Sequence, residues 1–157
     1  MKKWPMNQIA CSSLMLACCA FFFSCSSANQ VGQQEKIQSI SISAFGGELG
    51  YHRSLLITSD SIFYELGSAI DTINNKAVKK RNSQYKLEDI MTTNQLAKFS
   101  KITNGQSRQP VDGTDTSITI KTDSTEFKVT NGFKDNLWRS VMGKMNAIID
   151  KEFNETK

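Results

Sequence analysis

The chain has 157 residues, and its 19 Lys and Arg against 15 Asp and Glu give a formal net charge of +4 at pH 7. Lys2 and Lys3 are two of these cations, so residues 25–157 keep 17 basic and 15 acidic side chains and are close to balance. Nucleic-acid-binding proteins usually show a clustered basic face, and this balance argues against such a partner. Residues 25–157 have the length of one domain, enough to bury roughly two-thirds of the unfolded surface.

The first 24 residues have the layout of an export signal. Lys2 and Lys3 precede an uncharged, mostly apolar run from Ile9 to Ser24. A basic start, a short apolar run and small residues are typical of a signal peptide. A membrane-spanning helix needs ~20 apolar residues, and this run is shorter. The sequence therefore predicts a signal peptide over residues 1–24 rather than a permanent transmembrane segment.

The cysteines all lie within or directly after that run: Cys11, Cys18, Cys19 and Cys25. Cleavage before Cys25 leaves a single cysteine in the mature protein. A secreted domain held by disulfides keeps an even number of cysteines in its folded part, so this pattern does not indicate a disulfide-bonded domain. The segment Phe22-Phe23-Ser24-Cys25 resembles the lipobox of bacterial lipoproteins, with Phe22 and Phe23 in place of the usual Leu and Ala or Ser. Met15-Leu16-Ala17-Cys18 is a competing box, although cutting there would leave three phenylalanines at the mature N-terminus.

This resemblance implies a lipid anchor on Cys25, followed by a lipidated flexible tether over residues 25–36. Each buried acyl CH₂ contributes about 0.8 kcal/mol, so two or more chains hold a soluble domain at a bilayer. In the lipoprotein family an aspartate after the cysteine retains the protein in the inner membrane, so Ser26 implies the outer membrane. No acidic cluster of the kind that some surface-exported lipoproteins carry follows Cys25, which implies a periplasm-facing domain rather than a surface-exposed one.

Alternating residues predict the first strand of the domain. Ile40, Ile42 and Ala44 alternate with serines, which favours a strand with one buried face. Gly46-Gly47 and Gly50 then predict a turn.

Two similar segments follow, SLLITSDSIFYEL over residues 54–66 and SITIKTDSTEFKV over residues 117–129. Each predicts a β-hairpin that turns at Asp-Ser, with apolar residues opposite one another on one face. The expected pairs are Leu55 with Leu66, Ile57 with Tyr64, Ile118 with Val129, and Ile120 with Phe127. The likeness indicates either an internal hairpin-helix duplication, over residues 54–104 and 117–153, or convergence of two hairpins in one sheet.

Each hairpin is followed by a predicted helix. Thr92 and Gln95 form a capping box, and the helix that they open is expected to end at Asn104-Gly105. The second helix should start after Asp135 or Asn136. Its core-facing stripe comprises Trp138, Val141, Met142, Met145, Ile148 and Ile149. We expect Gly143 to allow close packing of this helix.

The predicted order of strand, hairpin, helix, hairpin and helix indicates an α+β domain over residues 37–157. Its antiparallel sheet would have about five strands, with two helices packed on one face. Residues 67–86 are polar and rich in Lys and Arg, and they are predicted to form a long loop.

No constellation for catalysis is found in the sequence. His52 is the single histidine, and no phosphate-binding loop, nucleophile elbow or zinc-ligand set is present. The sequence therefore predicts a protein that is not an enzyme and that has neither a cofactor nor a metal site.

A candidate binding patch follows from the alternation of strand residues. If Leu55 and Tyr64 face the helices, then Leu56 and Phe63 face outward, and Phe45 extends the same side. Exposed clusters of large apolar residues often mark interaction sites. The alternative is that residues 67–86 or the tether cover this patch. Weaker candidates lie beside the glycine turn: Tyr51, His52 and Arg53.

The region after the signal resembles small α+β envelope lipoproteins of Gram-negative bacteria. This resemblance implies a domain that binds another envelope protein, for example as an inhibitor or immunity factor. The alternative is an accessory structural lipoprotein of an outer-membrane assembly.

Overall fold

The computed structural model describes residues 35–153. The predicted signal peptide, Cys25 and most of the tether lie outside the described residues. No helix among the described residues is long and apolar enough to cross a membrane.

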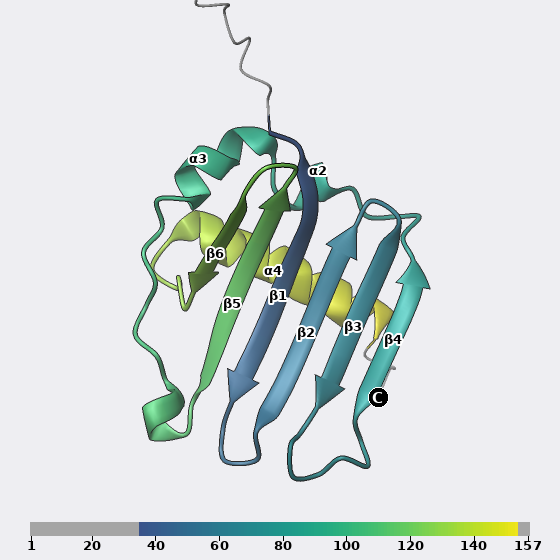
Figure 1. The fold of residues 1–157 in the computed structure, drawn as a ribbon, viewed down its shortest axis with the longest axis vertical. Coiled ribbons are helices and arrows are strands. Elements are labelled where there is room, and N and C mark those ends of the chain that lie inside the picture. The colour runs from purple at the N-terminus through teal and green to yellow at the C-terminus, as the bar shows by residue number, and fades with distance from the viewer. Residues whose placement is uncertain (1–34, 154–157) are drawn as a thin grey trace, which may run out of the picture. The chain divides into compact units, whose positions relative to one another are not determined.

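The described part of the chain is an α+β unit built on one open antiparallel sheet of six strands, where about five were predicted. The strands are β1 (Ile37–Gly46), β2 (Tyr51–Thr58), β3 (Ser61–Gly67), β4 (Lys76–Arg81), β5 (Thr114–Thr122) and β6 (Glu126–Thr130). The helices are α2 (Leu87–Ile90), α3 (Leu96–Phe99) and α4 (Asn136–Glu152), with single turns of 3-10 helix at η2 (Thr93–Gln95) and η3 (Gln109–Val111). The spatial order of the strands is β4-β3-β2-β1-β5-β6, so β1 lies between the two hairpins (Figure 1).

The sixth strand, β4, falls in the segment that the sequence predicted to be a loop. It pairs with β3 along its length, with Lys80 opposite Ile62 and Val78 opposite Tyr64. In the sequence KAVKKR, Val78 is the one large apolar residue, so no alternating pattern marks the strand. Basic side chains are tolerated here because β4 lies at the edge of the sheet, where lysines discourage pairing with other chains.

The register of the second hairpin was predicted correctly, and that of the first was not. Ile118 pairs with Val129 and Ile120 with Phe127, as expected. Leu55, however, pairs with Tyr64 rather than with Leu66. The Thr58 hydroxyl accepts a hydrogen bond from the Ser61 backbone N–H at 3.0 Å, which places the turn over residues 58–61. The observed register therefore differs from the predicted one by two residues. Because side chains alternate along a strand, the residues predicted to face the core still face it.

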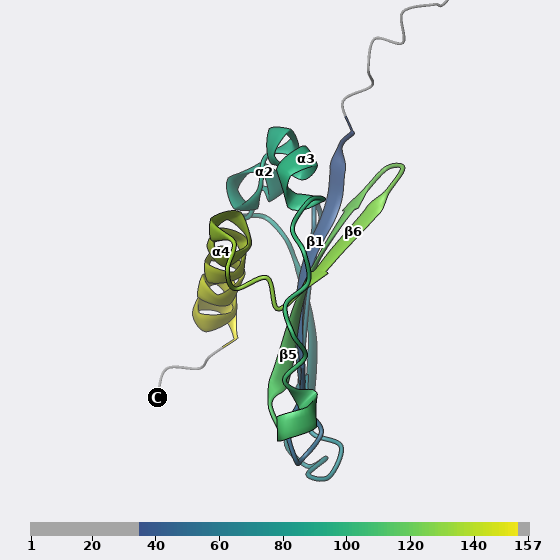
Figure 2. The same ribbon diagram turned by 90° about the vertical axis from the view of Figure 1, so that its left-hand side faces the viewer.

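Five of the six residues in the predicted core-facing stripe of α4 are buried, and the sixth, Met142, is partly buried against the core. Asp135 caps the helix, because its carboxylate accepts hydrogen bonds from two backbone N–H groups of the first turn. Figure 2 shows α4 on one side of the sheet. Trp138 is fully buried, and its indole N–H donates to the Val129 carbonyl at 3.2 Å. The buried side chains of α4 and the sheet form one core: Ile40, Leu55, Ile57, Ile118, Ile120, Trp138, Val141, Met145, Ile148 and Ile149.

The expectation that Gly143 allows close packing is wrong. A Cβ placed on this residue would meet no atom within 4 Å, since Gly143 lies on the exposed side of α4.

The helix predicted to start at Thr92 is shorter than expected. Its capping box is present, with the Thr92 backbone N–H donating to the Gln95 side chain at 3.0 Å. The chain leaves the helix after Phe99 and becomes bound to the edge of β6. There the Gly105 N–H donates to the Thr130 carbonyl at 2.8 Å, and the Thr130 N–H donates to the Asn104 side chain at 2.8 Å. These bonds satisfy backbone hydrogen-bonding groups on the outer edge of β6. The residues that make them are therefore not available to extend α3.

Candidate functional site

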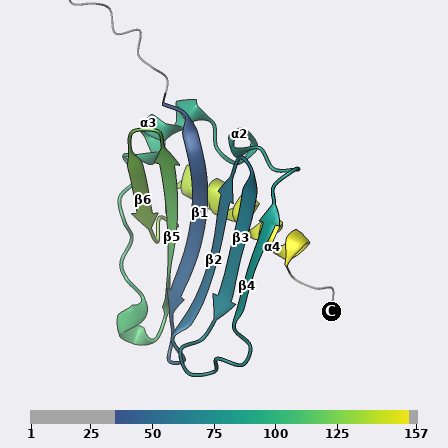
Figure 3. The same ribbon diagram turned by 45° about the vertical axis from the view of Figure 1, so that its right-hand side comes forward.

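The face of the sheet that points away from α4 carries the predicted binding patch. Figure 3 shows this open face in front, with α4 behind the strands. Ile62 and Tyr64 are buried on the α4 side, so Phe63 between them points to the open face. Leu56, which is 37% exposed, lies directly opposite Phe63. On β1, Phe45 also faces this side and is 55% exposed.

The patch consists of two separate parts. Leu56 and Phe63 form one cross-strand pair close to the turn that joins β2 and β3. Phe45 lies farther along β1, where the sheet approaches its turns. Between them the Ser54 hydroxyl donates to the Glu65 carboxylate at 3.3 Å, so a polar row interrupts the apolar surface.

The weaker candidates are divided between the two faces by the alternation of β2. His52 lies on the open face, opposite Phe45 on one side and Gly67 on the other. Arg53 points to the α4 side, where its guanidinium donates to the Asn146 side chain at 3.2 Å. Tyr51 lies two residues before Arg53 in β2, so its side chain points to the same side of the sheet. These three neighbours in sequence therefore do not form one site.

Three loops meet at the end of the sheet next to Phe45, and we call residues 47–50, 68–75 and 108–113 the loop end (Figure 1, bottom). The Gly47 N–H donates to the Gly113 carbonyl at 3.3 Å. The Leu49 carbonyl accepts from the Ala69 N–H at 3.2 Å and from the Ser68 hydroxyl at 2.7 Å. These bonds join residues 47–50 to each of the other two loops, so the three loops are held at the same end of the sheet.

The loop end exposes large apolar side chains. The exposed fraction is 55% for Leu49, 69% for Ile70, 92% for Ile73 and 80% for Val111. With Phe45 at its border, this end of the sheet holds five of the seven exposed large apolar residues in the described part of the chain. Leu49, Ile70, Ile73 and Val111 were not predicted from the sequence, because each is an isolated apolar residue in a polar loop and belongs to no strand or helix pattern.

The charge of the loop end is net acidic. Its ranges contain the acids Glu48, Asp71 and Asp112 and the single base Arg108, so three negative charges oppose one positive charge. The surface therefore combines exposed aliphatic side chains with carboxylates.

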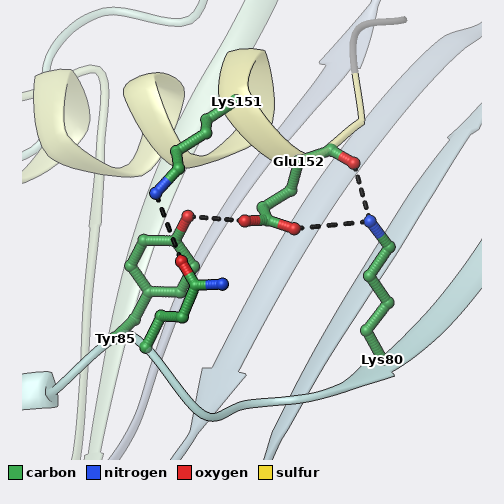
Figure 4. A network of polar contacts seen from close by, with 5 residues as sticks. Lys80, Tyr85, Lys151 and Glu152 are labelled. Carbon is green, nitrogen blue, oxygen red and sulfur yellow. Dashed lines mark hydrogen bonds and ion pairs between the residues drawn. The ribbon is translucent and has the colours of Figure 1, made fainter.

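A network of polar side chains at the C-terminal end of α4 has a structural role (Figure 4). The Tyr85 hydroxyl donates to the Glu152 carboxylate at 2.8 Å, and Lys80 forms an ion pair with the same carboxylate at 3.4 Å. Burial, and then the bond to Glu152, raise the pKa of Tyr85 to about 12. The Tyr85 hydrogen bond, more than Lys80, lowers the pKa of Glu152 below its ordinary value. The network ties α4 to β4 and to the segment after it.

Within residues 35–153, no three His, Cys, Asp or Glu side chains are grouped so that they could hold a metal ion. No model of a known protein family matches the chain, and no curated protein matches it either.

Proposed function

We propose that the chain is a lipoprotein of the outer membrane, anchored through Cys25 and facing the periplasm, whose domain binds another envelope protein without catalysing a reaction. The gathering of exposed apolar side chains at the loop end is the observation that supports this proposal. An inhibitor or an immunity factor would be a protein of this kind.

The physical argument concerns the free energy of hiding these side chains from water. Burying one Leu, Ile, Val or Phe side chain completely contributes about 1.5–3 kcal/mol. Contiguous exposed apolar surface on a folded domain usually marks an interaction site. Because hydrogen bonds already join the three loops, a partner would have little ordering cost to overcome.

The acidic charge of the loop end indicates what kind of partner surface would fit it. Glu48, Asp71 and Asp112 lie among the exposed aliphatic residues of the loop end. Complementary potentials across an interface favour encounter and suppress wrong partners. The complementary surface is therefore an apolar hollow bordered by lysine or arginine.

The place where the tether joins the domain is consistent with this proposal. β1 begins at the end of the sheet opposite the loop end (Figure 1). Its ten residues span about 33 Å at the usual rise of a strand. A tether from Cys25 would join the domain at that opposite end, which leaves the loop end free to meet a partner.

The anchor is tested by replacing its cysteine. Cys25→Ala should abolish incorporation of labelled palmitate and move the protein out of the membrane fraction. Cys18→Ala, the matched control, should leave both unchanged. Labelling that persists in Cys25→Ala and disappears in Cys18→Ala would place the anchor on Cys18 instead.

The binding surface is tested by a photo-crosslinking residue placed at Ile73 in intact cells. Position Ala97, which is also exposed but lies on α3, is the matched control. We expect a discrete adduct from position 73 and none from position 97. Excess soluble domain should compete the adduct away, and the Ile70→Ser/Ile73→Ser domain should fail to compete. Equal adducts at both positions, or equal competition by the double variant, would refute the proposed surface.

A further inference from the structure

A hollow of 630 Å³ lies between the segment after α3 and the segment that joins β6 to α4. It is lined by residues of the ranges 101–108 and 131–135. Its volume falls within the roughly 300–1,000 Å³ of small-molecule sites. The hollow is separate from the exposed apolar residues of the loop end.

The hollow is already formed in the free protein. Hydrogen bonds hold its first wall to β6, since the Thr130 carbonyl accepts from Gly105 and the Asn131 side chain donates to the Gln106 carbonyl at 2.9 Å. The two walls meet closely, because a Cβ added to Gly105 would lie 2.2 Å from the Asn131 carbonyl oxygen. A ligand would therefore not have to order these segments.

The charge of the lining is positive. Lys101, Arg108 and Lys134 line the hollow, and Asp135 is the one acid among its lining residues. The Asp135 carboxylate is engaged by two backbone N–H groups of α4, at 2.7 and 3.1 Å. Asp115 accepts the Arg108 backbone N–H at 2.7 Å and also attracts the charged Arg108 side chain, so it offsets part of the charge of that arginine. The two lysines remain to attract an anion.

An apolar part of the lining accompanies these lysines. Ile102 and Phe133 both contribute to the hollow, and Phe133 is 37% exposed. The Phe133 ring packs edge-on against Trp138, with 4.7 Å between the ring centroids. Since Trp138 is fully buried, it holds the Phe133 ring in place. A fixed, partly exposed aromatic ring favours stacking with a planar group of a ligand.

We propose that this hollow binds a small organic anion, a phosphate ester or a carboxylate, whose ring or short apolar body packs on Phe133 and Ile102. Lysine ammonium groups act as point charges that suit either anion. Arg108 is the one residue that both lines the hollow and belongs to the loop end, and the two lysines that attract the anion lie outside that end.

The test is a titration of the protein spanning residues 26–157, followed by ¹H–¹⁵N NMR. Phenyl phosphate, benzoate and inorganic phosphate serve as the three probes. We expect saturable shifts of Gly105, Gly132 and the Trp138 indole N–H, with a Kd of about 1 mM for the better ring-bearing probe. Inorganic phosphate should bind more weakly than the ring-bearing probes. Tighter binding of phenyl phosphate than of benzoate would identify a phosphate ester as the preferred ligand, and the reverse order would identify a carboxylate.

Variants connect these shifts to the lining. Lys101→Gln/Lys134→Gln should weaken the ring-bearing probes about tenfold, since charge-assisted contacts are lost. Phe133→Ala should reduce phenyl phosphate to the affinity of inorganic phosphate. Lys98→Gln, an exposed lysine of α3 outside the lining, should change nothing. Shifts spread over surface lysines, or equal affinity in the double variant and the control, would overturn the proposal.

Discussion

Two glycine-to-alanine substitutions should change the free energy of unfolding in opposite directions. Gly143 lies on the exposed side of α4, where an added methyl group would meet no atom within 4 Å. Glycine is about 0.8–1.0 kcal/mol less favourable than alanine inside a helix. We therefore expect Gly143→Ala to stabilise the domain by about 1 kcal/mol, which raises the melting temperature by roughly 3–5 °C at this size.

Gly132→Ala is the matched substitution in a crowded place. Its Cβ would lie 2.8 Å from two atoms of the Trp138 ring and 3.1 Å from a Val129 methyl group. Both neighbours are buried, at 0% and 3% exposure, so neither can move aside freely. Overpacking of this kind typically costs about 1–3 kcal/mol.

Urea unfolding of residues 26–157, followed by far-UV circular dichroism, measures both changes. The denaturant slope should be the same in both variants, so that shifts of the midpoint report stability alone. A neutral or destabilising Gly143→Ala would mean that α4 is covered at that point. A neutral Gly132→Ala would mean that Trp138 does not pack as described.

Three further predictions concern the network, the helix cap and the open face. The pKa of Tyr85 is raised from 10.0 to about 12, so the stability that this shift contributes is present below pH 10 and is lost as the pH rises through 12. Tyr85→Phe should remove this loss of stability at alkaline pH, as measured by unfolding at several pH values. Asp135→Ala removes the cap of α4 and should cost about 1 kcal/mol in chemical denaturation, with Asp135→Asn recovering most of it. Phe63→Ala on the open face should cost about 1 kcal/mol or less, whereas Leu55→Ala in the core should cost about 2–5 kcal/mol; similar losses in melting experiments would remove Phe63 from the accessible surface.

The elements with a clear apolar period were predictable from the sequence. Ile40 and Ile42 alternate with serines, and α4 repeats its large apolar residues every three or four positions. The register of the first hairpin was not predictable in this way. A shift of two residues keeps every side chain on its face, so the apolar pattern fits both registers equally well. The side-chain hydrogen bonds of Thr58 mark the turn instead.

The parts that were missed depend on contacts between distant segments. β4 has almost no apolar pattern, because an edge strand needs only one partner and can present lysines to solvent. Leu49, Ile70, Ile73 and Val111 lie at one end of the sheet because residues 47–50 are hydrogen-bonded both to residues 68–75 and to residues 108–113, and no local rule predicts these contacts. The outward orientation of Phe45, Leu56 and Phe63 could be predicted, since it needs only the alternation of strands.

The central position of β1 has a mechanical consequence. β1 is paired with β2 on one side and β5 on the other along most of its length. Its first residue follows the N-terminal segment, and its last lies at the loop end. If the domain is held at the N-terminus and pulled by a partner at the loop end, tension runs along β1. Hydrogen bonds between antiparallel strands lie perpendicular to the strands, so this tension shears both ladders at once rather than opening them one bond at a time. A domain loaded in this direction should resist forced unfolding better than one pulled apart across β4 and β6.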